Sequence, residues 1–75
     1  MREKNEPPLR IWVVYDHPID YPDCYVARLF EGTEPTDSIV CSTDLEMVRH
    51  EMFMMGLIMF PRDDSDDPKI LENWL

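Results

Sequence analysis

Two short stretches of this 75-residue sequence contain the side chains best suited to chemistry. The first stretch, Asp16–Asp23, reads DHPIDYPD and supplies three carboxylates, one imidazole and two prolines. The second stretch, Asp63–Asp67, reads DDSDD and supplies four more carboxylates. Groups of this kind can hold a metal ion, move a proton, or accept hydrogen bonds from arginine and lysine. The spacing of the residues decides between these kinds of chemistry.

A metal centre needs ligands whose spacing lets them converge, such as two histidines four residues apart or a Cys-x-x-Cys pair. The two histidines, His17 and His50, are far apart in the sequence, and no Cys-x-x-Cys pair is present. Neither aspartate stretch has the alternating aspartates, central glycine and distal glutamate of a calcium loop. The sequence therefore predicts no metal site and no cofactor, and a metal-dependent enzyme using His17 and the nearby aspartates is the least favoured alternative.

The first stretch is better explained as a stiff connection between two strands. Aspartate side chains accept backbone N–H hydrogen bonds in Asx turns, and Pro18 and Pro22 fix their own φ angles near about −65°. Each proline also drives the residue before it towards an extended conformation. We therefore interpret Asp16–Asp23 primarily as a structural segment.

Residues for covalent catalysis are present, but no motif surrounds them. Cys24 and Cys41 lie in strand-like runs, and none of the three serines stands in a nucleophile elbow. With only two glycines, the chain also lacks a glycine-rich phosphate loop. The sequence thus predicts a protein that is not an enzyme and has no catalytic residues. Two cysteines are too few for the disulfide framework of a small secreted domain, so we expect free thiols.

The charge of the chain restricts its partners more than any motif does. Sixteen acidic residues and seven basic ones give a net charge of −9, and from Ile11 onward fourteen acids face four bases. Such a field repels phosphate groups, so we expect no direct binding of nucleic acid or of an anionic membrane. The charge either keeps a small protein soluble or attracts a basic surface of a protein partner. In the second case we expect exposed, unneutralised carboxylates to bind the partner, namely those of Asp16, Asp20, Asp23, Asp63, Asp64, Asp66 and Asp67.

Hydropathy indicates a protein of the cytoplasm. No run approaches the roughly 18 apolar residues that a membrane span requires, and the first residues are charged, with no hydrophobic signal region behind them. We therefore expect neither a membrane span nor a secretory signal.

The elements that must position these residues are those of one small α+β domain. Residues 1–9 are polar and end in two prolines, and we interpret them as a flexible N-terminal arm. Residues 10–75 then form a single domain. Its expected strands are 11–15, 24–30, 38–41 and 57–60, with a helix from about residue 43 to 55 and a possible final strand at 70–75. The order βββαβ predicts a mostly antiparallel sheet, in which the first three strands form a meander and one helix packs on one face.

The sequence of the helix indicates both its start and its apolar side. Thr43 and Glu46 fit a capping box, and Gly56 ends the helix. Methionines are frequent between residues 47 and 59, and their helical spacing beside leucine and valine favours core packing. The alternative is an exposed, adaptable recognition patch, for which Met47 and Met54 are the first candidates. Trp74 is expected to pack across the sheet.

The aspartate stretches also carry a resemblance. The pattern YDHPxDYPD from Tyr15, followed by DPxIxExWL from Asp67, resembles a group of small uncharacterised bacterial and phage-borne proteins over residues 12–75. The resemblance implies a bacterial or mobile-element setting and implies no particular activity. In that setting, compact acidic proteins can cover the nucleic-acid-binding face of a host enzyme, as some anti-restriction and anti-CRISPR inhibitors do.

Two binding hypotheses therefore precede the enzyme hypothesis. In the first, the acidic surface docks on a basic partner, in the manner of a phage-type inhibitor that acts by DNA mimicry on a host nucleic-acid-handling defence complex. In the second, the protein is an interaction or regulatory module with an apolar interface, including a homodimer formed through an unpaired edge strand such as Ile70–Leu75. The protein is thus expected to be a monomer or a homodimer.

Overall fold

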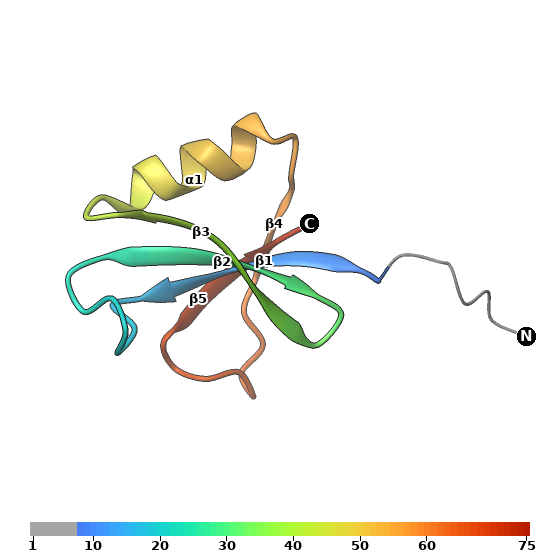
Figure 1. Cartoon of the computed structure of the whole chain (residues 1–75), viewed down its shortest axis with the longest axis horizontal. Coiled ribbons are helices and arrows are strands. Elements are labelled where there is room, and N and C mark those ends of the chain that lie inside the picture. The colour runs from blue at the N-terminus through green and yellow to red at the C-terminus, as the bar shows by residue number, and fades with distance from the viewer. Residues whose placement is uncertain (1–7) are drawn as a thin grey trace, which may run out of the picture.

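The computed structural model describes residues 8–75, which form one antiparallel sheet with a helix on one side (Figure 1). The elements in chain order are β1 (Arg10–Asp16), β2 (Tyr25–Glu31), β3 (Glu34–Ser42), α1 (Leu45–Met54), β4 (Met59–Pro61) and β5 (Ile70–Trp74). The predicted α+β class, with the order βββαβ followed by a final strand, is confirmed.

The strands lie in the order β3-β2-β1-β5-β4, and every neighbouring pair is antiparallel. The predicted meander of the first three strands is therefore correct, and β1, which is apolar on both alternate sets of positions, is the central strand. The hypothesis that Ile70–Leu75 forms an unpaired edge was wrong, because β5 lies between β1 and β4. This apolar, tryptophan-containing strand gains more burial inside the sheet than at its edge.

The hairpin between β2 and β3 is tighter than the sequence suggests. Residues 31–37 were expected to form a loop, but only Gly32 and Thr33 separate the two strands. Gly32 has a φ of 64°, which is the left-handed conformation that a two-residue hairpin turn requires. Pro35 is accommodated because β3 is an edge strand and needs no N–H on its outer side.

The helix begins one residue later than the capping-box assignment predicts. Asp44, not Thr43, is the N-cap, and its carboxylate accepts the backbone N–H of Glu46 at 3.0 Å. An aspartate at this position also interacts favourably with the helix dipole, which explains the preference. The predicted end is correct, because Met55 caps the helix and Gly56 follows with a φ of 79°.

The core lies between α1 and the sheet. Val48 and Met52 from the helix are fully buried against Val14 and Ala27 from the sheet, and Trp74 completes the cluster as predicted. The helix packs chiefly on β2 and β3, so the β5 and β4 side of the same face receives less cover (Figure 1).

Two predictions about apolar residues were wrong, because α1 covers only part of one face of the sheet. The segment 57–60 was expected to be a buried strand, but Ile58, Met59 and Phe60 are exposed because β4 is the outermost strand. The methionine cluster was expected to fill the core, but Met52 is its only buried member. The sheet has five strands and α1 covers part of one face, so these side chains have no partner layer within residues 8–75.

Most of the predicted N-terminal arm, residues 1–7, lies outside the described residues. Leu9, at its end, is held to the hairpin because its carbonyl oxygen accepts the N–H of Gly32 at 2.7 Å. Among the described residues, no helix has the length and apolar character needed to cross a membrane.

Candidate binding surface at the acidic end of the sheet

The two aspartate stretches, far apart in the sequence, are neighbours in the structure. β1 and β5 are antiparallel, so the end of β1 lies beside the start of β5. The N–H of Asp16 donates to the carbonyl oxygen of Lys69 at 2.7 Å, and Lys69 Nζ donates to the carbonyl oxygen of His17 at 3.1 Å. We call this end of the sheet, formed by residues 16–23 and 63–67, the acidic end.

The first stretch is a hydrogen-bonded connection between β1 and β2. The N–H of His17 donates to the carbonyl oxygen of Cys24 at 3.0 Å and closes the segment. Inside it, the N–H of Tyr21 donates to the carbonyl oxygen of Pro18 at 3.0 Å. His17 itself has a φ of 51°, contacts the carboxylate of Asp16, and sets its ring edge-on to Tyr25 at 4.8 Å. These contacts support the interpretation of this stretch as a structural segment.

The second stretch uses its carboxylates as turn acceptors. Asp63 accepts the N–H of Ser65 at 3.2 Å, Asp66 accepts that of Asp63 at 2.9 Å, and Asp67 accepts that of Lys69 at 2.9 Å. Asx-type hydrogen bonds, which were predicted for the first stretch, therefore occur in the second. Within residues 8–75, the carboxylates of the first stretch accept hydrogen bonds from the side chains of His17 and Arg28 and none from a backbone N–H. A carboxylate has about four acceptor positions, so one backbone N–H leaves most of its capacity for a partner.

The candidate partner-binding residues differ in their exposure and in their neighbours. Five of them are exposed and two are half-buried: the exposed ones are Asp20, Asp23, Asp63, Asp64 and Asp67, and the half-buried ones are Asp16 and Asp66. The expectation that no counter-charge neutralises them was wrong for Asp20, which pairs with Arg28 at 3.3 Å. The seven aspartates still outnumber Arg28, Arg62 and Lys69, so the acidic end keeps a negative charge.

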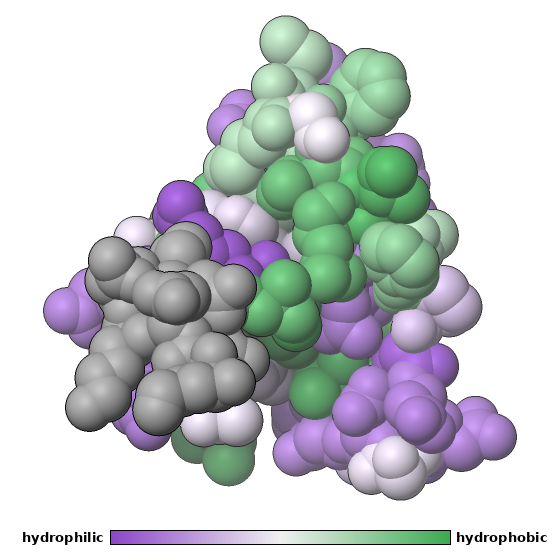
Figure 2. Space-filling model, turned by 90° about the vertical axis from the view of Figure 1, so that its right-hand side faces the viewer, coloured by the Kyte–Doolittle hydropathy of each residue, from purple (hydrophilic) through white to green (hydrophobic). Residues whose placement is uncertain are grey.

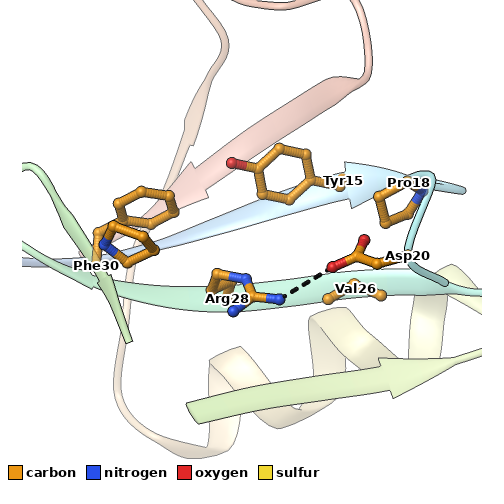
Figure 3. Close-up of a pocket in the computed structure, with 7 residues that line it drawn as sticks. Tyr15, Pro18, Asp20, Val26, Arg28 and Phe30 are labelled. Atoms are coloured by element: carbon orange, nitrogen blue, oxygen red, sulfur yellow. Dashed lines mark hydrogen bonds and ion pairs between the residues drawn. The ribbon is translucent and has the colours of Figure 1, made fainter. Parts of the chain in front are cut away.

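A pocket of about 420 Å³ lies beside the acidic end, on the sheet face opposite α1 (Figure 3). Val14 and Ala27 face the helix, so the alternate residues of β1 and β2 face the other way. The pocket is lined by Tyr15, Pro18, Asp20, Val26, Arg28, Phe30 and Pro35. Figure 3 shows the Arg28–Asp20 ion pair with the ring of Tyr15 beside it.

The hydroxyl group of Tyr15 lies in the electrostatic field of several charged side chains around the pocket. Burial raises the pKa of Tyr15 above its ordinary value, Arg28 lowers it, and the carboxylates of Asp67, Asp20 and Asp66 raise it. Carboxylates from both aspartate stretches thus act on the same hydroxyl group, and the negative field of the acidic end extends into the pocket.

Within residues 8–75, no group of three or more histidine, cysteine, aspartate or glutamate side chains is arranged to hold a metal ion.

Sequence reasoning missed an ionic cluster around a buried carboxylate on the helix side of the sheet. Glu72 of β5 is 3% exposed, and its carboxylate accepts hydrogen bonds from Arg49 Nη2 at 2.9 Å and from Trp74 Nε1 at 3.0 Å. Hydrogen bonds from its side chain to Glu72 raise the pKa of Arg49, and burial opposes this. Arg49 also donates to Glu46 at 2.9 Å, so the cluster joins α1 to β5.

The signal for this cluster is present in the sequence but weak. Arg49 follows Leu45 by four residues and precedes Met52 by three, which places it beside the apolar stripe of the helix. Glu72 and Trp74 are two residues apart on a strand and therefore share a face. The pairing of the helix with β5 is a tertiary contact, and spacing alone does not reveal it.

The two thiols are expected to differ in reactivity. Cys24 and Cys41 are both free, and partial burial together with the neighbouring Cys41 thiol raises the pKa of Cys24. Cys41 is exposed on the edge strand β3. Because the thiolate is the nucleophile, we expect iodoacetamide at about pH 8 to alkylate Cys24 several-fold more slowly than Cys41.

Peptide mass spectrometry can measure the two alkylation rates, because trypsin cleavage after Arg28 separates the thiols. In urea the two rates should converge. If Cys24 were alkylated faster than Cys41 in the folded protein, the expected difference in thiol reactivity would be wrong.

Comparison with known proteins gives no match: no family model, no curated protein and no solved structure matches this chain.

Proposed function

We propose that this protein is a non-enzymatic binding protein whose acidic end docks on a basic surface of a protein partner. The observation that carries the proposal is the convergence of the two aspartate stretches, which the Asp16–Lys69 and Lys69–His17 hydrogen bonds hold together. Two segments that are separate in the sequence thereby form one negatively charged surface. If the same charges were distributed evenly over the whole molecule, they would increase solubility without forming a binding surface.

The chemistry of the acidic end suits partners that are rich in arginine and lysine. Exposed carboxylates accept paired hydrogen bonds from guanidinium groups, and a one-sign surface speeds the diffusional encounter with a surface of opposite sign. Proteins that handle nucleic acids carry such basic surfaces because they bind phosphates. We therefore propose a nucleic-acid-handling partner, in which the aspartates take the place of phosphates, as in an inhibitor that acts by DNA mimicry.

The neighbouring pocket adds a second type of contact. The rings of Tyr15 and Phe30 line the same pocket as Asp20, with Tyr15 near Asp20 and Phe30 at the opposite end (Figure 3). An arginine or lysine side chain can place its apolar stem against such rings and its charged group against a carboxylate. The pocket and the acidic end together would therefore favour a basic side chain over a simple cation.

The proposal predicts that the position of the charges matters and not only their number. The acidic-end variant carries Asp23→Asn, Asp63→Asn, Asp64→Asn and Asp67→Asn. Asparagine keeps a carbonyl acceptor for the turn hydrogen bonds, so the loops should fold as before. We expect this variant to bind a fluorescent decalysine peptide roughly tenfold more weakly at low salt, measured by fluorescence anisotropy. The same variant should lose the partner that the wild-type protein captures from a bacterial lysate.

A control variant removes the same number of charges elsewhere. Glu31→Gln, Glu34→Gln, Asp37→Asn and Glu51→Gln change exposed residues outside the acidic end. We expect this variant to bind decalysine only about two- to threefold more weakly, through the loss of net charge. Equal weakening by the two variants, or a captured partner that stays bound in about 1 M salt, would contradict docking through the acidic end.

A further inference from the structure

A large group of apolar side chains is exposed on the side of the molecule that Figure 2 shows. We call it the apolar patch. Its members are 38–69% exposed and are Met47, Phe53, Met54, Met55, Ile58, Met59, Phe60 and Leu75. In Figure 2 the hydrophobic colouring runs from the top of the molecule to its centre, whereas hydrophilic residues gather at the lower right. The alternation of β4 places Met59 on the helix side of the sheet and Ile58 and Phe60 on the other side, so the patch wraps around the outer edge of the sheet. Soluble monomers rarely expose this much apolar surface in one region without a partner for it.

The patch is free of charge in a highly charged chain. The ten residues from Met52 to Pro61 include no charged side chain, although 31% of all residues are charged. The patch also lies away from the acidic end. β5 begins next to the acidic end, and at its other end Leu75 exchanges two backbone hydrogen bonds with Ile58, at 2.8 and 3.0 Å.

The size of the patch matches one side of a stable interface. A fully exposed side chain of this size presents roughly 200 Å², so the eight side chains together offer on the order of 800–900 Å². Stable protein interfaces bury about 800 Å² on each partner.

The surface is also hollowed where a partner side chain can enter. A shallow groove of about 650 Å³ runs between α1 and β5 and is lined by Glu46, Met47, Arg49, His50, Phe53 and Trp74. It exists because α1 packs chiefly on β2 and β3. The flexible side chain of Met47, which lines the groove, can adapt to the shape of whatever enters.

Strand pairing cannot provide most of the contact. β4 is the outer strand here, but both backbone groups of Ile58 already bond to Leu75, and Pro61 has no N–H to offer. In an antiparallel pair, the backbone groups of successive residues point alternately towards the neighbouring strand and away from it. In β4 those of Met59 point away from β5, so its N–H is the one N–H of this strand that is open to another strand. The proline therefore protects this edge against strand addition, and side chains must make the contact.

We infer that the apolar patch is a self-association surface, on which a second copy of this chain docks in a two-fold contact. Two copies with a charge of −9 each repel each other least where acids are fewest, and the segment Met52–Pro61, which supplies six of the eight patch residues, contains none. A symmetric contact of patch with patch directs the two acidic ends away from each other, which minimises their repulsion. A basic partner would instead be attracted to the acidic end.

Sedimentation equilibrium of the full chain tests this inference. From about 10 to about 500 µM protein, we expect the mass to rise from 9.0 kDa to twice that value. Raising the salt from about 0.15 to about 1 M should favour the dimer, because salt screens the repulsion between the copies and strengthens apolar contact. Binding at the acidic end should respond to salt in the opposite direction, so the two proposals can fail independently.

The chain offers a matched pair of substitutions. Ile58→Glu places a charge in the patch at a residue that is 66% exposed, and Ile19→Glu places the same charge at a residue that is 92% exposed in the first aspartate stretch. We expect Ile58→Glu to weaken dimerisation at least tenfold and Ile19→Glu to leave it unchanged. Met54→Lys, at a 67% exposed position, should act like Ile58→Glu. Circular dichroism should show the wild-type fold in all three variants.

Three results would overturn the inference. The first is a wild-type protein that stays a monomer at about 500 µM in both salts, which would leave the patch to a different protein. The second is equal weakening by Ile19→Glu and Ile58→Glu, which would place the contact elsewhere. The third is a dimer that neither Ile58→Glu nor Met54→Lys weakens.

Discussion

Met52→Ala is expected to lower the free energy of unfolding by about 3–4 kcal/mol. Met52 is fully buried between α1 and the sheet, where it contacts the cluster of Val14, Ala27, Val48 and Trp74. Alanine removes the transfer free energy of the lost atoms and leaves a cavity that the surrounding side chains fill only in part. A chain of this length has a total stability of roughly 5 kcal/mol, so the variant should be partly unfolded at body temperature.

The matched control is Met54→Ala, two residues along the same helix. Met54 is 67% exposed, so the same substitution should change the unfolding free energy by less than about 0.5 kcal/mol. Urea denaturation followed by circular dichroism measures both values, in dilute protein so that self-association does not contribute. Equal losses in the two variants would mean that the helix packs on the sheet through a different side.

Arg49→Met is expected to cost about 2–4 kcal/mol of stability by leaving the carboxylate of Glu72 without a cation. The Glu72 side chain is 4% exposed, whereas that of Arg49 is 38% exposed. Removal of one member of a fully buried pair costs about 3–5 kcal/mol, and the partial exposure of Arg49 reduces this value. Trp74 Nε1 remains as a donor to Glu72 in the variant, but a neutral N–H does not balance the charge.

A double substitution separates the ion pair from the fold of the helix. Arg49→Met combined with Glu72→Gln removes both charges and keeps an acceptor for Trp74, so it should recover at least about half of the loss. Arg10→Met, at an exposed position at the start of β1, serves as the control and should have almost no effect. Urea denaturation of the wild type, Arg49→Met, Glu72→Gln and the double variant gives the coupling energy. A double variant that is less stable than Arg49→Met would show that the charge on Glu72 is not the cause.

Much of the fold could be predicted because local sequence decides it. The β-branched and aromatic runs after Arg10 and after Cys24 form strands, and Gly56 ends the helix because it adopts a left-handed conformation at little cost. The short connections then favour antiparallel neighbours. The capping-box pattern favoured Thr43 as the N-cap, but Asp44 takes that position, because both residue types can accept a backbone N–H at a helix start.

The order of the strands and the cover of the sheet could not be predicted in the same way. Apolar runs such as Ile58–Phe60 and Ile70–Leu71 look equally fit for burial, but the first lies at the edge and the second inside. The methionine-rich helix likewise has apolar residues on more than one side, and the position of the sheet decides which side is buried.

The candidate site shows the same division between local and tertiary information. The turn-forming role of the aspartates follows from their side chains, whereas their convergence depends on the pairing of β1 with β5. The Arg49–Glu72 pair depends on the placement of α1 over the sheet, which no spacing rule supplies.

The composition of the apolar patch has a chemical consequence for the protein. Met47, Met54, Met55 and Met59 are all at least 45% exposed, whereas Met52 is fully buried. Peroxide would therefore oxidise the four exposed thioethers in the folded protein while the core stays intact. Each sulfoxide adds a strongly polar S=O group to the patch. Samples kept in air would gradually become more hydrophilic on this side, and methionine sulfoxide reductases would reverse the change.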